Sequence, residues 1–305
     1  MIALFGPTGV GKTAVAVALA RRLRTSGERP VAVSADALQV YAGLEILTGA
    51  AGQQERGELE HRLLSFLPLQ ERFSAGRYAE LAHREIDRLL ESGQRPIVVG
   101  GTGLYLRAAL AELSLAPPPR TGVRERWLAE LEREGPAALH AVLSARAPLA
   151  ASEISPGDRH RIVRALELVD SGDLPPARER SEASELWTEA TRRPTLLVGL
   201  VMAREQLYAQ IDTRVDEMLA AGVREEVERA AATGASETAR KALGFQELLA
   251  GDVEAMKRRT RNYARRQLTW MRKLPAVHEL DLTERDPDQA AEEIVRVWFD
   301  YACAP

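Results

Sequence analysis

The chain has 305 residues, a formal net charge of −3 and one cysteine, Cys303, near its C-terminus. Its 45% of apolar and 28% of charged residues are typical of a globular protein with one large or two modest domains. A lone cysteine excludes an internal disulfide and suits a reducing cytoplasm. No apolar run approaches the roughly 20 residues that cross a bilayer. We also expect no signal peptide.

Residues 6–13, GPTGVGKT, match the G-x-x-x-x-G-K-[ST] pattern of a phosphate-binding loop. An apolar stretch at residues 2–5, interpreted as a buried strand, precedes the loop, and residues 13–24 after it have a helical apolar period. The loop N–H groups and the helix N-terminus attract an anion, Lys12 would add charge at the outer phosphate, and the Thr13 hydroxyl would hold Mg²⁺. The pattern indicates a diphosphate or triphosphate without specifying ATP. The residues predicted to surround it are Gly6, Pro7, Thr8, Gly9, Val10, Gly11, Lys12 and Thr13.

Strand and helix patterns alternate over the first 120 residues, which predicts an α/β fold with a parallel sheet and helices on both faces. In such sheets ligands lie at the carboxyl ends of the strands. We therefore expect the phosphate-binding loop, Asp36 and the Gly100-Gly101-Thr102 turn to converge on one site. The later segments of this pattern are a strand at 30–36, a helix at 74–93, a strand at 95–103 and a helix at 105–113.

The alternation stops at the Pro-rich segment 116–122. Only helical patterns follow, up to a second polar, Pro-containing segment at 173–185. A buried strand at 194–202 then resumes the core, and 277–282 is a possible edge strand. We infer a P-loop NTPase-like core formed by residues 1–120 and 191–305, with a helical insertion at 121–190. The helical patterns of the insertion begin at Arg124, Pro136 and Asp158.

A basic segment at 257–273, KRRTRNYARRQLTWMRK, carries eight basic residues and no acid. On a helix, Arg258, Arg265 and Arg272 recur every seven residues with Arg261 beside them, and the aromatic residues Tyr263 and Trp270 have the same spacing. Such a stripe fits a polyanion such as RNA. A charged face paired to acids elsewhere in the chain is the alternative. For the two aromatic residues, packing on the core is favoured over stacking on bases.

Acidic residues near the phosphate-binding loop are few. P-loop ATPases usually place a carboxylate at the end of a later strand, whereas residues 95–103 end in glycines and Thr102. The acid within reach is Asp36, which would hold Mg²⁺, act as general base on a nucleophile beside the phosphates, or only cap a helix.

These motifs together resemble the tRNA dimethylallyltransferase (tRNA isopentenyltransferase) family over nearly the whole chain and in the same order. The resemblance rests on GPTGVGKT, SADALQVYAGLEILTG, HRLLSF, FSAGRY, VVGGTGLYLRAAL, DRHRIVRALE, RKALGFQEL and RNYARRQLTWMR, of which GGTGLY and ARRQLTW are the most specific.

The resemblance implies that the loop holds dimethylallyl diphosphate and that the acceptor is the exocyclic amine of the adenosine 3′-adjacent to a tRNA anticodon. It implies Asp36 as the base, with Lys12 and Thr102 as further catalytic residues and Mg²⁺ on Thr13. The anticodon stem-loop would contact the insertion and the basic helix of a monomeric enzyme. The residues implied at the tRNA are Asp36, Ala37, Leu38, Gln39, Thr102, Arg124, His160, Arg161, Arg164, Lys241, Gln246, Arg261 and Arg265.

The sequence departs from the family pattern in two places. Ala37 replaces the serine that commonly follows the catalytic aspartate, and residues 47–51, LTGAA, lack the basic residue of the usual GTAKP. Three alternatives remain at this level: a P-loop nucleoside or nucleotide kinase, a prenyltransferase acting on free adenine nucleotides, and an RNA-binding protein with a vestigial loop. The acid-free basic segment argues against the first two, and intact Lys12, Thr13 and Asp36 argue against the third.

Overall fold

The computed structural model describes residues 1–117, 120, 122–174 and 185–303. The chain forms two compact units: a core unit, Met1–Glu112 with Leu186–Pro305, and a helical unit, Leu113–Glu185. The sequence placed the insertion at 121–190, a few residues later at each end. Most of the expected linker at 173–185 lies outside the described residues. Within these ranges, no helix is both long and apolar enough to cross a membrane.

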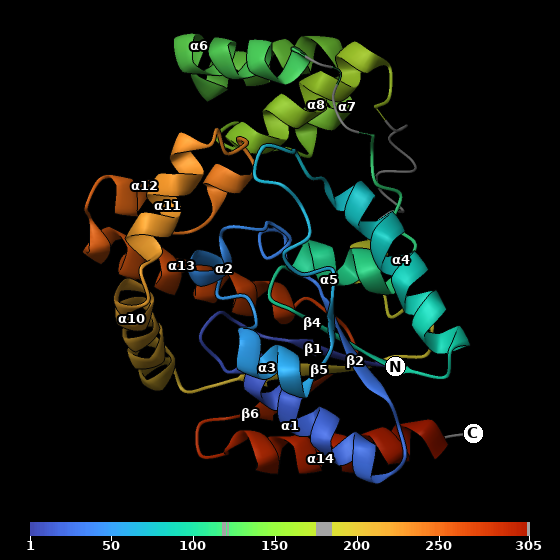
Figure 1. Cartoon of the computed structure of the whole chain (residues 1–305). Coiled ribbons are helices and arrows are strands. Elements are labelled where there is room, and N and C mark those ends of the chain that lie inside the picture. Colours follow the sequence, from blue (N-terminus) through green and yellow to red (C-terminus); the bar gives the residue numbers. More distant parts are fainter. Residues whose placement is uncertain (118–119, 121, 175–184, 304–305) are drawn as a thin grey trace. The chain divides into compact units, whose positions relative to one another are not determined.

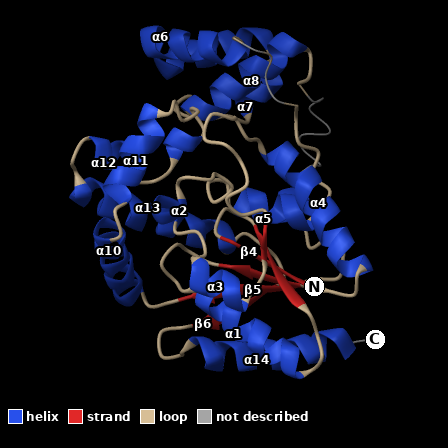
Figure 2. Cartoon of the chain, in the orientation of Figure 1, coloured by secondary structure: helices blue, strands red, loops and turns tan. Residues whose placement is uncertain are grey.

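A parallel sheet forms the centre of the core unit (Figure 2). Its strand order is β3-β2-β4-β1-β5-β6, and β6 lies at an edge, as expected. Strand β1 is buried along its whole length because β4 and β5 flank it, which explains its continuous apolar run. The described strands are β1 (Ile2–Phe5), β2 (Pro30–Ser34), β3 (His61–Arg62), β4 (Arg95–Gly100), β5 (Leu196–Val201) and β6 (Val277–Asp281).

Helices cover the sheet on both faces (Figure 1). Helices α1 and α14 lie side by side on one face, where Leu19 and Ile294 pack with Ile2 and Leu4 of β1. Helices α4 and α5 pack together on the other face. The helices of the core unit are α1 (Lys12–Thr25), α2 (Glu45–Thr48), α3 (Gln53–Glu58), α4 (Ala75–Glu91), α5 (Gly103–Leu110), η1 (Glu185–Trp187), α10 (Arg204–Ala220), α11 (Val223–Ala232), η2 (Ala239–Lys241), α12 (Phe245–Leu249), α13 (Val253–Met271) and α14 (Pro287–Cys303).

The ends of α4 follow the signals in its sequence. The Ser74 hydroxyl accepts a hydrogen bond from the Arg77 backbone N–H at 3.2 Å, so it caps the helix as predicted. The chain leaves the helix through Gly93 at a φ of 69°, a conformation that glycine adopts without strain. Helices α2 and α3 and the two-residue strand β3 are too short to leave a periodic pattern, and the sequence did not predict them.

The helical unit has a small core of its own. Trp127, Leu131 and Leu139 of α6 pack against Ile162 and Leu166 of α8. Helix α6 is interrupted at Gly135, whose φ of 81° is not helical, so the patterns beginning at Arg124 and Pro136 form two helical stretches. The helices of this unit are α6 (Val123–Arg146), α7 (Pro148–Ser152) and α8 (Arg159–Ser171).

Candidate active site

A cavity of about 860 Å³ opens in the core unit at the carboxyl ends of β1, β2 and β4. The structure therefore brings together the three segments that the sequence expected to converge. Gly6, Pro7 and Val10 of the predicted loop are buried and do not line it. Residues that do line it include Thr8, Gly9, Gly11, Lys12, Thr13, Asp36, Ala37, Leu38, Gln39, Thr102, Arg214, Lys241, Tyr263 and Gln267.

The phosphate-binding loop is closed by its lysine. The Lys12 ammonium donates to the carbonyls of Gly6 and Pro7 at 3.0 and 2.8 Å. Burial, and then the nearby Arg214 cation, lower the pKa of Lys12 to about 7. Gly11 precedes α1 at a φ of 92°, which turns the chain into the helix without a side-chain cap. The loop thus places a lysine of lowered pKa and a helix N-terminus at the cavity.

Arg214 is a cation at this site that the sequence analysis missed. It projects from α10 to the cavity, and its guanidinium donates to the Gly49 carbonyl at 3.1 Å. Arg214 and Lys12 line the same cavity, and the Arg214 cation lowers the pKa of Lys12. An anion in the cavity would offset their mutual repulsion.

Asp36 lies just beyond β2 and uses its two carboxylate oxygens differently. Oδ1 accepts from the backbone N–H groups of Leu38 and Gln39 at 2.9 and 3.4 Å. This closes a turn, where the alternative interpretation had a helix cap. Oδ2 accepts from the Thr102 hydroxyl at 3.3 Å, and Thr102 in turn lies 3.2 Å from the Tyr263 hydroxyl. The turn therefore orients the carboxylate, and its second oxygen faces the cavity side chains.

Close packing requires the glycines on either side of Thr102. Thr102 precedes α5 but makes no capping bond, so its hydroxyl serves the Asp36 contact. A side chain at Gly100 would collide with the backbone of Ala35, and one at Gly103 with the Trp270 indole. Glycine is therefore needed at these positions because a side chain would not fit, and not because of the backbone conformation of a turn.

Gln267 of α13 joins two of these segments. It is 5% exposed. Its Oε1 accepts from the Thr8 backbone N–H at 2.8 Å, and its Nε2 donates to the Gly101 carbonyl at 2.7 Å. The Thr8 N–H is thereby occupied, and the loop N–H groups that remain for an anion come after it. No spacing in the sequence indicated this bridge.

The family-implied residues around the acceptor lie in several places. Ala37, Leu38 and Gln39 line the cavity. Lys241 also lines it and forms an exposed ion pair with Glu237 at 2.8 Å, whereas Gln246 is exposed away from the cavity.

The basic helix α13 is partly neutralised by acids from other elements. Arg261 donates to both carboxylate oxygens of Asp212 at 2.6 and 2.7 Å. Lys257 pairs with Asp216 at 2.7 Å, and Arg259 pairs with Glu247. The remaining members of the stripe are exposed: Arg258, Arg265, which donates to Asn262, and Arg272.

The two aromatic residues of α13 differ from each other. Trp270 packs on Phe5, Trp187 and Gly103, as predicted. Tyr263 instead lines the cavity, with its hydroxyl at Thr102. The helix therefore contributes a wall of the site as well as an exposed basic face.

In the helical unit, two arginines implied at the tRNA share one buried carboxylate. Arg124 forms two hydrogen bonds with Glu167, at 2.6 and 2.9 Å, and Arg164 donates to the same group at 3.0 Å. The Glu167 side chain is fully buried. Arg124 thereby holds α6 to α8, whereas Arg164 lies on α8 itself and also donates to the Ala116 carbonyl at 3.0 Å. The interpretation of these arginines as solvated charges did not anticipate this. His160 and Arg161 are exposed at the start of α8.

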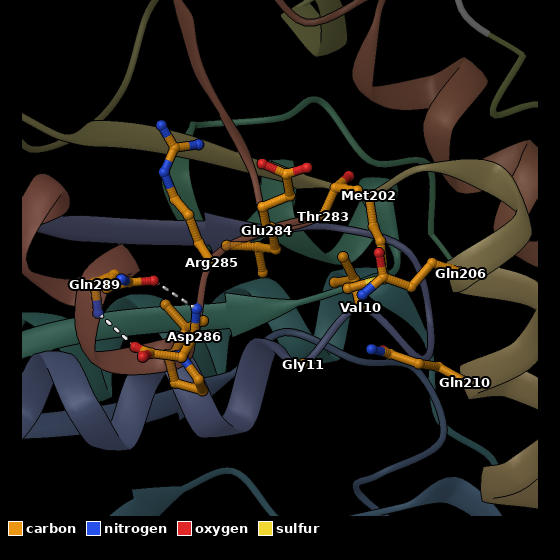
Figure 3. Close-up of a pocket in the computed structure, with 13 residues that line it drawn as sticks. Val10, Gly11, Met202, Gln206, Gln210, Thr283, Glu284, Arg285, Asp286 and Gln289 are labelled. Carbon is orange, nitrogen blue, oxygen red and sulfur yellow. Dashed lines mark hydrogen bonds between the residues drawn. The ribbon is translucent and has the colours of Figure 1, made fainter.

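A second pocket of about 380 Å³ lies beside the loop after β6, and shares Gly11 with the main cavity (Figure 3). Gln206 and Gln210 of α10 line it on one side, and Asp286 and Gln289 on the other. The Asp286 and Gln289 side chains bond each other's backbone N–H groups at 2.8 and 3.0 Å, so they cap α14.

The described part of the chain contains no group of three or more His, Cys, Asp and Glu side chains arranged to hold a metal ion. The main cavity has three carboxylates on its wall, Asp36, Glu55 and Glu217, together with the Thr13 hydroxyl. A metal ion there would need oxygen ligands from a bound phosphate or water.

The parallel sheet and the loop at the end of β1 define a P-loop NTPase-like α/β protein, and comparison with known proteins identifies its family. Residues 39–274 match the model of the family described as IPP transferase. A tRNA dimethylallyltransferase from Kineococcus radiotolerans is 40% identical over 310 residues, covering 97% of this chain and 96% of that protein. The chain belongs to the IPP transferase (tRNA dimethylallyltransferase) family.

Solved structures agree with this assignment. The full-length tRNA isopentenylpyrophosphate transferase from Bacillus halodurans superposes with a TM-score of 0.70 at 31% identity, covering 98% of this chain and 95% of that one. The tRNA delta(2)-isopentenylpyrophosphate transferase from Staphylococcus epidermidis gives 0.68 at 31% identity and covers 98% of both chains.

Proposed function

We propose that this chain transfers the dimethylallyl group of dimethylallyl diphosphate to N6 of the adenosine 3′-adjacent to the anticodon in tRNA, releasing diphosphate. The observation that carries the proposal is the shared cavity: a phosphate-binding loop and the carboxylate of Asp36 line the same space. Strand β4, where an ATPase would place its acid, ends in glycine and Thr102 instead. Family membership supplies the identity of donor and acceptor.

The donor half of the proposed site binds the diphosphate. The N–H groups of the loop after Thr8 other than that of Val10, which bonds to the Pro7 carbonyl, would surround the anion together with the N-terminus of α1, Lys12 and Arg214. When the bond between the allylic carbon and oxygen breaks, negative charge increases on the departing diphosphate. Cations already fixed in the site stabilise that charge without reorganising, and such electrostatic stabilisation is usually what accelerates a reaction of this kind most.

The acceptor half supplies a base. The exocyclic amine of adenosine is a poor nucleophile because its lone pair is delocalised into the ring. As N6 bonds to the allylic carbon, its proton would pass to Oδ2 of Asp36, the oxygen that faces Thr102. Thr102 would hold this oxygen in place, and Gln39 and Leu38 would line the adenosine, which must leave its stack to enter.

Mg²⁺ fits the oxygen groups present, with Thr13 as its proposed protein ligand. Mg²⁺ commonly uses one or two protein oxygens together with substrate phosphates and water, and the cavity offers Thr13, Asp36 and Glu55. When bound, the ion would offset charge on the diphosphate. Lys12 and Arg214 remain the groups of this chain that orient the donor.

Binding of the tRNA is assigned to exposed basic residues of both units. Arg265, Arg272 and Lys241 lie exposed on the core unit, and His160 and Arg161 on the helical unit. Arg124, Arg164 and Arg261 are only partly exposed and each is paired with a carboxylate, so they are proposed to shape these surfaces. The enzyme is proposed to act as a monomer.

The test is label transfer. Radiolabelled dimethylallyl diphosphate should label unmodified tRNA in the presence of Mg²⁺, and free adenosine or AMP should accept no label. Labelled ATP, with a nucleoside or with tRNA, should give no phosphoryl transfer. Robust phosphorylation of a nucleoside, or equal labelling of free AMP, would reject the proposal.

A further inference from the structure

The loop at residues 47–51, which lacks the basic residue of the family pattern, presents backbone carbonyls to the active site. The Gly49 carbonyl accepts from the Arg214 guanidinium at 3.1 Å and from Gln39 Nε2 at 3.2 Å. The Thr48 carbonyl accepts from the same amide at 3.3 Å. The Gly49 carbonyl therefore holds both a side chain proposed for the diphosphate and one proposed for the adenosine, and the Thr48 carbonyl holds the second of these as well.

Close approach of Arg214 to this loop depends on glycine. Gly49 has a φ of 56°, and a Cβ at this position would overlap the Arg214 guanidinium. Any side chain here would push Arg214 away from its acceptor. The loop LTGAA thus carries no basic side chain of its own, and instead its Gly49 carbonyl holds the Arg214 cation of α10.

The loop itself is anchored by a buried acid from a distant element. Glu226 of α11 is 4% exposed, and its two carboxylate oxygens accept from the backbone N–H groups of Ile46 and Leu47 at 2.9 and 2.8 Å. These N–H groups lie in the first turn of α2, which has no side-chain cap of its own. Bonds to an ionised acceptor are stronger than neutral ones, and an unpaired buried N–H is costly.

We propose that Glu226 is a positioning residue of the donor site. It fixes α2, so that the Gly49 carbonyl holds Arg214 in place and the Thr48 and Gly49 carbonyls hold Gln39. This inference rests on the proposed function for the identity of the ligands. The way in which the Arg214 side chain is held does not depend on that identity. It assigns the divergent loop a role that requires no charged side chain.

The primary test compares Glu226→Gln with Glu225→Gln, its exposed neighbour on α11. An amide at 226 keeps the size of the side chain but loses one acceptor oxygen. Calorimetric affinity for inorganic pyrophosphate with Mg²⁺ should fall roughly tenfold in Glu226→Gln, about the value of one charge-assisted hydrogen bond. It should not change in Glu225→Gln. Unchanged pyrophosphate affinity in a folded Glu226→Gln protein would overturn the proposal.

A double-mutant cycle separates positioning from general stability. If Glu226 acts through Arg214, adding Glu226→Gln to Arg214→Ala should weaken pyrophosphate binding by less than about twofold beyond Arg214→Ala alone. Additive losses would overturn the proposal, because a change acting only on the fold would weaken both backgrounds alike.

Gly49→Ala keeps the test decisive even if Glu226→Gln fails to fold. This variant leaves the Glu226 anchor intact and displaces Arg214, so it should reproduce the pyrophosphate defect; wild-type affinity would contradict the mechanism. Because pyrophosphate binding needs no tRNA, these results hold whether or not prenyl transfer is observed. If no label is transferred but the double-mutant cycle gives the predicted result, the proposed reaction is rejected and the role of Glu226 in holding Arg214 stands.

Discussion

Gln267 and Thr8 are separated by 259 positions in the chain but joined by a hydrogen bond of 2.8 Å from the Thr8 N–H to the Gln267 side chain. The other end of the same amide holds Gly101. Lys12 Nζ lies 3.4 Å from the point where a Gly101 Cβ would stand, so the bridge is next to the lysine that closes the loop. The helix proposed to face RNA thereby also fixes the donor loop.

Gln267→Ala is expected to weaken donor binding by roughly tenfold, because the loop loses a buried hydrogen bond and Gly101 loses its donor. The turnover number at saturating donor should change much less. The KM for dimethylallyl diphosphate and the affinity for pyrophosphate measure this. Thr269→Ala, an exposed change on the same helix, is the control. A fall in turnover with an unchanged donor KM would show that the bridge does not serve the donor loop.

Asp36→Asn should slow the chemical step by about 10²–10⁴-fold, the usual contribution of a positioned base. The turn bonds to Leu38 and Gln39 can persist with an amide oxygen, so donor affinity should be retained. Single-turnover label transfer with enzyme in excess measures the step. Recovery of the rate at high Mg²⁺ would assign Asp36 to metal binding instead.

Donor binding should take up a proton above neutral pH. The pKa of Lys12 is lowered to about 7 without ligand, and a bound anion favours the ammonium form and raises it. Between pH 7 and the raised pKa, the complex therefore holds more protons than the free protein, and donor affinity falls as pH rises through this window.

Calorimetric titration at pH 8, in buffers with different ionisation enthalpies, measures the uptake. Lys12→Arg keeps its charge and should bind the donor without it. Equal apparent enthalpies in all buffers for the wild-type protein would contradict the role given to Lys12.

Salt dependence should distinguish the two kinds of arginine on α13. Arg265 and Arg272 are exposed, and each phosphate they neutralise contributes about 0.7–0.9 to the slope of log K against log salt. Arg265→Gln with Arg272→Gln should weaken tRNA binding and flatten the slope by up to about two contacts. Arg261→Gln should leave the slope unchanged, since Arg261 is paired with Asp212. Filter binding across a salt series measures these slopes. An unchanged slope in the double variant would show that Arg265 and Arg272 do not contact the tRNA phosphates.

The sequence predicted those parts of the fold and site that depend on local patterns. The strand at Ile2–Phe5 is apolar throughout because it is buried throughout, and Ser74 caps the helix that follows it in sequence. Asp36 and Thr102 could be placed because parallel strands end at the same edge of the sheet.

The rest depends on partners far away along the chain. Arg214 and Glu226 have no motif around them, and the ARRQLTW motif does not reveal the partners of Gln267. Their roles come from backbone groups that are 165 to 259 positions distant. For the same reason, basic side chains that look free in sequence are paired: Asp212 lies 49 positions before Arg261.

Product analysis tests the central claim most directly. After reaction with labelled dimethylallyl diphosphate, the tRNA is digested to nucleosides and the label is assigned by chromatography and mass. We predict a single labelled product, N6-dimethylallyladenosine from the position 3′-adjacent to the anticodon, and none when that adenosine is replaced by guanosine. Label on another nucleoside, or unchanged labelling of the guanosine variant, would contradict the account.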